Sequence, residues 1–253
     1  MTIAITVAGK GGVGKTVISS LLIDQLSKKG VVLAIDADPS TNLNTALGLP
    51  LEATVGGARE DMTRDIAKGS ISPGVSKQEF LDMKIRDALV ESSKIDLLAM
   101  GRPEGPGCYC AANHMLRASI DRMAKNYEYV VIDSEAGMEH ISRQTTQNVD
   151  FLFVITDPTM RGLTAAARVR DLIKEMRTKV GKVFLVVNRV KNGLAPEMRQ
   201  AIEGWGLDII AVIPEDPNLS ELEIKGKPII ELPENSPLKI AVREIIAKAG
   251  IGA

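Results

Sequence analysis

Short runs of apolar, β-branched residues recur along the chain, and most are followed by a stretch whose apolar residues return at helical spacing. This alternation predicts an α/β fold with one doubly wound, mostly parallel sheet of about seven or eight strands, flanked by helices. The expected strands are residues 3–8, 31–36, 95–100, 129–133, 151–156, 183–188 and 209–213. Clear helical periodicity covers residues 17–28, 111–126, 162–176 and 238–248.

Two segments interrupt the alternation of strand and helix. Residues 50–94 are polar and helix-like with Gly-rich turns, and they predict a helical insertion between the second and third strands. Residues 101–110 hold three glycines and two prolines directly after the third strand, so we expect an exposed loop there. Because no repeat or low-complexity linker is present, residues 1–253 are expected to form a single domain.

The composition narrows the class of protein further. Apolar residues make up 45% of the chain and aromatic residues only 3%, which suits buried parallel strands. The net charge is −1 with both signs mixed, whereas a nucleic-acid partner would need clustered basic residues. The chain start does not look like a signal peptide, and no apolar run approaches the roughly 18 residues of a membrane span. We therefore expect a cytoplasmic protein with no nucleic-acid partner and no stable membrane association.

The first expected strand leads into a segment that matches the phosphate-binding motif G-x-x-x-x-G-K-[ST] at every position. Glycines let successive backbone N–H groups face phosphate oxygens, and the positive end of the following helix adds to the same anion site. Lys15 would reach the β- and γ-phosphates, and the Thr16 hydroxyl would bind Mg²⁺. The expected nucleotide-binding residues are Gly9, Lys10, Gly11, Gly12, Val13, Gly14, Lys15, Thr16 and Val17.

A second lysine, Lys10, follows the first glycine, although a P-loop needs only one lysine for its own nucleotide. The run Gly-Lys-Gly-Gly-Val-Gly-Lys-Thr resembles the deviant Walker A motif of the family that includes MinD, the plasmid-partition ATPases, the arsenical-pump ATPase and the nitrogenase iron protein. The resemblance implies an ATPase that works as a face-to-face homodimer. It also implies that Lys10 crosses the dimer and neutralises charge on the partner's transferring phosphoryl group.

Two aspartates close the second expected strand, at the edge of the sheet where open α/β sheets bind ligands. Asp38-Pro39 aligns with the Asp-Pro pair in the first switch of the iron protein, which implies that Asp38 positions the attacking water. Asp36 is expected to be structural or to lie in the outer shell of the site. The alternative is that both residues merely form a turn.

The fourth expected strand ends at Asp133, which is the Walker B pattern and would hold Mg²⁺ through water. The segment from Asp133 to Gly137 also keeps the Asp-x-x-x-Gly spacing of the family's second switch. The strand at residues 183–188 ends in Asn188, without the aspartate of the guanine-specific motif Asn-Lys-x-Asp. In the family, an asparagine here and a Pro-containing loop after the next strand flank adenine. Asn188, Pro214 and Asp216 match these positions and favour ATP.

The two cysteines of the chain lie in Cys108-Tyr109-Cys110. A disulfide between residues two apart would be strained, and the cytosol disfavours it. The pair supplies two ligands, whereas nickel and zinc favour four-coordinate sites. A two-fold dimer would supply an identical pair, so we expect Cys108 and Cys110 of both subunits to bind one Ni²⁺ or Zn²⁺ ion. The alternative is that one chain recruits His114, which we expect to be an ordinary surface residue.

A deviant Walker A ATPase of this length with a Cys-x-Cys after the third strand resembles the nickel-insertion ATPases that mature carbon monoxide dehydrogenase. This resemblance implies nickel as cargo and the nickel-dependent carbon monoxide dehydrogenase as partner. ATP binding would close the dimer around the metal, and hydrolysis would open it. The alternative is an electron-transfer ATPase of the nitrogenase iron protein type, in which the four cysteines hold an iron–sulfur cluster.

Overall fold

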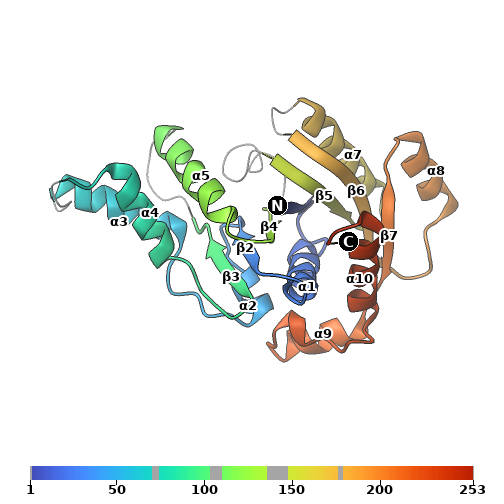
Figure 1. Ribbon diagram of the computed structural model, residues 1–253. Helices are drawn as coiled ribbons and strands as arrows, with labels where there is room; N and C mark the ends of the chain where they lie inside the picture. Colours follow the sequence, from blue (N-terminus) through green and yellow to red (C-terminus); the bar gives the residue numbers. More distant parts are fainter. Residues whose placement is uncertain (1, 70–73, 103–109, 136–147, 176–178, 253) are drawn as a thin grey trace.

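The computed structural model describes residues 2–69, 74–102, 110–135, 148–175 and 179–252 (Figure 1). Its centre is a seven-stranded sheet with the order β3-β2-β4-β1-β5-β6-β7, in which all neighbouring strands pair in parallel. The doubly wound parallel fold expected from the sequence is thereby confirmed. The strands are β1 (Ile3–Gly9), β2 (Val32–Asp36), β3 (Ile95–Ala99), β4 (Tyr129–Asp133), β5 (Asn148–Thr156), β6 (Lys179–Val190) and β7 (Ile209–Pro214).

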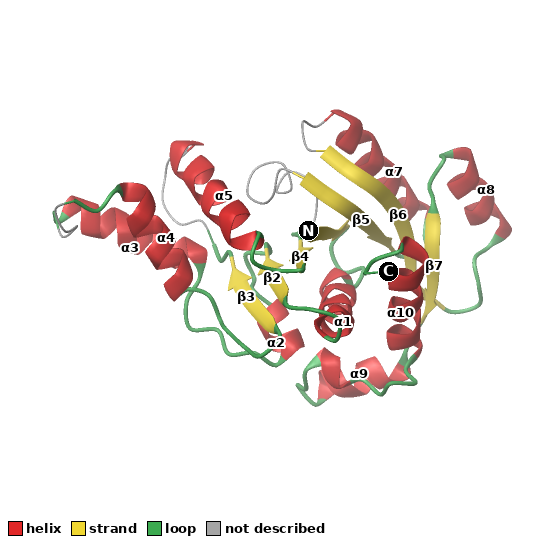
Figure 2. Cartoon of the chain, viewed as in Figure 1, coloured by secondary structure: helices red, strands yellow, loops and turns green. Residues whose placement is uncertain are grey.

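Helices cover both faces of the sheet (Figure 2). One face carries α1 (Lys15–Ser27), α2 (Leu43–Leu47), α10 (Pro237–Ala249) and the 3-10 turn η1 (Ile229–Glu231). The other face carries α3 (Val55–Ala67), α4 (Lys77–Asp87) and α5 (Cys110–Ala124) over β2–β4, and α7 (Met160–Glu175) and α8 (Pro196–Gly204) over β5 and β6. The short helix α9 (Pro217–Ile224) follows β7 and contacts η1.

The strands are apolar at almost every position because both faces of the sheet are buried. Side chains alternate between the two faces along each strand. In β1, Ile5 and Val7 pack in the cluster around α1, whereas Ala8 joins the cluster around α7. In β4, Val131 packs on the α1 side and Val130 on the α5 side. Helix α1 is therefore held between the sheet and α10, with most of its residues buried.

The register aligns the carboxyl ends of four strands in one row. Ala99 of β3 lies opposite Asp36 of β2, Asp36 lies opposite Asp133 of β4, and Asp133 lies opposite Val7 of β1. All neighbouring strands are parallel, so the loops that leave this row lie at the same edge of the sheet. The chain therefore carries the glycine-rich motif and both strand-end aspartates to one edge.

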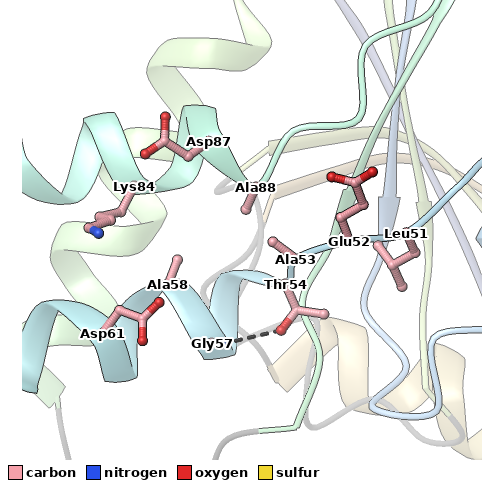
Figure 3. Close-up of a pocket in the computed structure, with 10 residues that line it drawn as sticks. All are labelled: Leu51, Glu52, Ala53, Thr54, Gly57, Ala58, Asp61, Lys84, Asp87 and Ala88. Carbon is pink, nitrogen blue, oxygen red and sulfur yellow. Dashed lines mark hydrogen bonds between the residues drawn. The ribbon is translucent and has the colours of Figure 1, made fainter.

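Residues 50–94 contain α3 and α4. Helix α4 begins with a capping box, in which Ser76 and Glu79 each accept a hydrogen bond from the other's backbone N–H. Helix α4 is fastened to α5 by Asp82, which accepts hydrogen bonds from Ser119 and Arg122. A cavity of about 440 Å³ lies between α3, the end of α4 and residues 51–54, where the Gly57 N–H donates to the Thr54 hydroxyl (Figure 3). Over the described ranges, no helix has the length and apolarity to span a membrane.

Candidate functional site: a phosphate-binding loop and its aspartates

The glycine-rich loop between β1 and α1 needs its glycines for two separate reasons. Gly9, Gly12 and Gly14 have φ values of 150°, 78° and 93°, which L side chains rarely adopt. Space is also lacking at two of them. A Cβ on Gly9 would lie 2.2 Å from the Ile155 carbonyl oxygen of β5, and one on Gly14 would lie 2.6 Å from the Asn188 side-chain amide. The loop therefore packs closely against the ends of β5 and β6.

Lys15 is the first residue of α1, and its side chain lies within the loop. Its ammonium group donates to the Lys10 carbonyl oxygen at 3.2 Å. Burial lowers the pKa of Lys15, while the negative charges of Asp133, Asp38 and Glu135 act in the opposite direction. A largely buried and therefore only partly hydrated cation is a strong partner for phosphate oxygens.

Asp133 connects the end of β4 to the first turn of α1. The Thr16 hydroxyl donates to one carboxylate oxygen at 2.6 Å, and the buried Ser19 hydroxyl donates to the other at 2.9 Å. Burial raises the pKa of Asp133 to about 6, against the opposing effect of these hydrogen bonds and of Lys15. A hydroxyl and a carboxylate next to a phosphate site form the hard oxygen donor set that Mg²⁺ prefers. The residues present therefore fit Mg²⁺.

Asp36 and Asp38 differ in their surroundings. Asp36 is fully buried and accepts hydrogen bonds from the backbone N–H groups of Leu43 and Asp38 at 2.9 and 3.1 Å. Burial raises its pKa to about 6. These contacts match the structural role expected for Asp36. Asp38 is half-buried, and one of its oxygens accepts from the Ser40 N–H at 2.9 Å, which leaves its second oxygen outside this turn. Its role in positioning water stays a prediction.

A cavity of about 520 Å³ adjoins the loop on the β6–β7 side. Asn188 stands at its inner wall and donates from its side chain to the Val13 carbonyl oxygen at 2.9 Å. Pro214 forms part of the wall at the end of β7. The lining residues are Gly14, Val17, Asn188, Arg189, Pro214, Glu215, Asp216, Pro217, Leu219, Ser220, Glu223 and Leu238. A cavity of this size beside the phosphate loop is large enough for a purine base.

Asp216 lines this cavity, but its carboxylate is used within the protein. One oxygen accepts from the Asn218 N–H at 3.0 Å, and the other accepts from the Ser236 hydroxyl and from the Leu238 N–H at 3.3 Å. Asp216 thus joins the start of α9 to the start of α10. These contacts fix the position of Asp216 in the cavity wall.

The two remaining kinds of predicted site residue are the second lysine and the cysteines. The Lys10 side chain is exposed and makes no hydrogen bond or ion pair with the residues that the structure describes. Cys108 lies outside the described residues, as does Gly137. Cys110 is the first residue of α5. Within the described ranges, no group of three or more His, Cys, Asp or Glu side chains is arranged around a metal position.

Two residues at the site were not identified from the sequence. Ser19 has no motif, and only its spacing of one helical turn from Thr16 signals that both hydroxyls share one face of α1. Arg189 directly follows Asn188 in a segment that lacks the aspartate of the guanine-specific motif, and the sequence suggested no role for it. Its guanidinium in fact donates to the Gly12 carbonyl oxygen at 2.9 Å.

A parallel doubly wound sheet, a complete phosphate-binding loop, and an aspartate bonded to the motif threonine define a P-loop nucleoside triphosphatase. A family model described as the CobQ/CobB/MinD/ParA nucleotide binding domain matches residues 4–229. The chain belongs to this family, and it is an ATP hydrolase.

Individual relatives match between about two thirds and the whole of the chain. It is 46% identical to an ATP-binding protein of Methanocaldococcus jannaschii over 96% of this chain and 97% of that protein. It is 35% identical to the carbon monoxide dehydrogenase accessory protein CooC of Rhodospirillum rubrum, over 69% of this chain and 70% of CooC. The structure of Pyrococcus horikoshii MinD complexed with Mg-ADP matches with a TM-score of 0.69 at 22% identity, covering 100% and 99% of the two chains. This last similarity concerns the fold alone.

Proposed function

We propose that this ATPase is a nickel metallochaperone that carries the metal between two subunits and delivers it to a nickel-dependent carbon monoxide dehydrogenase. ATP binding closes the homodimer around one Ni²⁺ ion, which Cys108 and Cys110 of both subunits hold and which Zn²⁺ can replace. Hydrolysis opens the dimer and releases the ion. The metal is cargo in this cycle, whereas Mg²⁺ with ATP drives it.

The observation that carries the proposal is the common row of strand ends. The segment with both cysteines leaves β3 just beyond Ala99, in the row that also contains Asp36, Asp133 and Val7. It returns to the described chain at Cys110, where α5 begins. The cysteine segment therefore starts from the same edge of the sheet as the phosphate loop. A dimer that meets across this edge would bring both thiol pairs and both nucleotides into one interface.

The chemistry of the thiols supports a soft transition metal as the cargo. Thiolate ligands select nickel, zinc and copper(I) over magnesium or calcium. A four-coordinate site needs four ligands, whereas the Cys-x-Cys pair of one chain supplies two. A two-fold axis provides the second pair without any further residue. Metal binding and nucleotide-driven closure then stabilise the same dimer, so each should strengthen the other.

The described residues also support the hydrolysis half of the cycle. Lys15 and the N–H groups of the loop would bind the β- and γ-phosphates, while Thr16 and Asp133 would hold Mg²⁺. Asp38 would orient a water in line with the γ-phosphorus. The oxygen of this water forms the new bond as the bond to ADP breaks, and the products are ADP and inorganic phosphate. The exposed Lys10 side chain makes no hydrogen bond or ion pair with the described residues, which suits a lysine that reaches the nucleotide of a second subunit.

The similarity to CooC supports carbon monoxide dehydrogenase as the recipient, because it extends over more than two thirds of both chains. The second candidate is an electron-transfer ATPase, in which the same four thiolates hold an iron–sulfur cluster. This alternative predicts iron and sulfide in the purified protein instead of nickel or zinc.

The proposal is tested by the spectrum and metal content of protein purified without oxygen. We expect a protein that contains neither iron nor sulfide and binds about one Ni²⁺ or Zn²⁺ ion per dimer. Replacing either cysteine (Cys108→Ser or Cys110→Ser) should abolish this binding and leave ATP hydrolysis measurable. A brown protein with iron and sulfide would support the cluster instead. Unchanged nickel binding in both variants would contradict the cysteine site.

A further inference from the structure

The end of β6 makes two consecutive contacts with the phosphate-binding loop. The Asn188 side-chain amide donates to the Val13 carbonyl oxygen, and the Arg189 guanidinium donates to the Gly12 carbonyl oxygen, both at 2.9 Å. About 175 residues separate the two partners of each contact. Neighbouring side chains of one strand thus hold neighbouring carbonyl groups of the loop.

The backbone of β6 is distorted where these side chains originate. The pairing of β6 with β7 is irregular between Val187 and Val190. Arg189 has a φ of 60°, in the left-handed region that non-glycine residues rarely occupy. The Asn188 side-chain oxygen accepts a hydrogen bond from the Arg189 N–H at 2.9 Å, which holds this conformation. In a regular strand these two side chains would point to opposite faces of the sheet, so the irregularity lets both of them reach the loop.

Holding these carbonyl groups also fixes the orientation of the N–H groups that bind phosphate. In a trans peptide the C=O and the following N–H point in opposite directions, and the described chain contains no cis peptide bond. Turning the Gly12 carbonyl towards Arg189 therefore turns the Val13 N–H away from β6. Turning the Val13 carbonyl towards Asn188 does the same for the Gly14 N–H. Successive N–H groups that face one side of a loop form an anion-binding concavity.

The charges around Arg189 leave the guanidinium available for this contact. Arg189 is the one cationic side chain among the residues that line the 520 Å³ cavity, which also include Glu215, Asp216 and Glu223. The nearby Lys191 forms an ion pair with Glu215 at 3.6 Å, and the Asp216 carboxylate is occupied by Ser236 and Asn218. Among the described residues, the Gly12 carbonyl oxygen accepts a hydrogen bond from the Arg189 guanidinium.

We propose that Arg189 is a positioning residue, which fixes the phosphate-binding loop in its anion-binding shape before nucleotide arrives. It acts through the Gly12 peptide group rather than through contact with the reacting atoms. This inference concerns the nucleotide end of the protein. It does not depend on the identity of the metal cargo, so it can fail while the metallochaperone proposal stands, and the reverse also holds.

The test compares Arg189→Ala with Lys191→Ala in the full-length protein. Both variants remove one positive charge beside the cavity, but only the first removes the contact with Gly12. Hydrogen–deuterium exchange of the peptide covering residues 9–16 is measured without nucleotide, and the Kd for MgATP is measured by calorimetry. In Arg189→Ala we expect exchange of this peptide to become several-fold faster and Kd to rise about five- to tenfold. Lys191→Ala should change neither quantity by more than about twofold.

A third variant separates the side chain from the backbone strain. Arg189→Gly also removes the guanidinium, but glycine adopts a φ of 60° at no steric cost. It should reproduce the faster exchange and the weaker MgATP binding without any loss of thermal stability. If MgATP binding weakens in Arg189→Ala while exchange stays unchanged, Arg189 contacts the nucleotide directly and the proposal is overturned. Unchanged exchange and unchanged affinity would overturn it as well.

Discussion

The Thr16 hydroxyl and the Asp133 carboxylate are 2.6 Å apart, although 117 residues separate them in the chain. The contact follows from the fold, because β1 and β4 are neighbouring strands with Val7 opposite Asp133. The pairing of these two strands thereby brings the last residue of the phosphate-binding motif next to the aspartate that ends β4. The fold therefore places the two oxygen groups that would hold Mg²⁺ in direct contact.

Ser19 should matter for magnesium because it fixes the second oxygen of Asp133. We expect Ser19→Ala to raise the Mg²⁺ concentration for half-maximal ATP hydrolysis by about tenfold, since a hydrogen bond to a charged group contributes about 1.5–3 kcal/mol. Ser20→Ala is the matched control, because Ser20 is equally buried in α1 but donates to the Val17 carbonyl oxygen. Equal effects of the two substitutions on the Mg²⁺ dependence would show that Ser19 has no specific role.

Asp133 should make the nucleotide-free protein less stable as pH rises. Burial raises the pKa of Asp133 in the folded protein to about 6, above the ordinary value near 3.8 that it regains on unfolding. The folded state therefore binds more protons between these values, and the free energy of unfolding falls as pH increases through this range. Asp133→Asn should remove about 1 kcal/mol of the difference in unfolding free energy between pH 5 and pH 7. Urea denaturation of both proteins at both pH values measures the free energy of unfolding. The same pH 5 to pH 7 difference in Asp133→Asn and in the natural protein would argue against a raised pKa of Asp133.

Gly9 should be required for folding as well as for nucleotide binding. A Cβ at this position would lie 2.2 Å from the Ile155 carbonyl oxygen, which is part of the β1–β5 ladder and cannot move freely. We expect Gly9→Ala to lower the free energy of unfolding by about 2 kcal/mol or more. Gly204→Ala in α8 is the control, because that site has open space and should be neutral or stabilising. The idea fails if both variants unfold at the same urea concentration as the natural protein.

Lys10 should act between subunits rather than within one. Lys10→Ala retains the backbone carbonyl that accepts from Lys15, so MgATP binding should stay within about threefold of the natural protein. Sedimentation with ATP should detect dimers of the natural protein and monomers of the variant. Lys125→Ala, which removes an exposed lysine beyond the end of α5, should dimerise normally. Dimers of Lys10→Ala with ATP would contradict the proposed role.

The sequence predicted all seven strands of the sheet, because parallel strands buried on both faces appear as continuous apolar runs. The predicted strand boundaries were less accurate where polar residues occur inside strands. β6 starts at Lys179 instead of residue 183 and extends to Val190, beyond the expected end at Asn188. Lys179 and Lys182 interrupt the apolar pattern, and the continuation past Asn188 depends on the irregular pairing with β7.

The sequence also predicted the phosphate loop, because a loop whose backbone surrounds phosphate needs glycines and a lysine at a fixed spacing within a few residues. It did not predict the contacts that hold the loop from outside. Ser19 and Arg189 reach Asp133 and Gly12 only because distant strands become neighbours. Asp216 matched a family position, but its bonds to Ser236 and Leu238 depend on the packing of α10 against β7. Tertiary pairing of this kind leaves no local pattern.

The central claim, that nucleotide controls a metal site shared by two subunits, is tested most directly by measuring bound nickel and molecular mass on the same sample. Protein is equilibrated with Ni²⁺, with and without MgATP, and passed through size exclusion with light scattering and metal analysis. We expect a dimer with about one Ni²⁺ ion when ATP is present, and a monomer with much less nickel when it is absent. A monomer that retains nickel equally well with and without ATP would contradict the account.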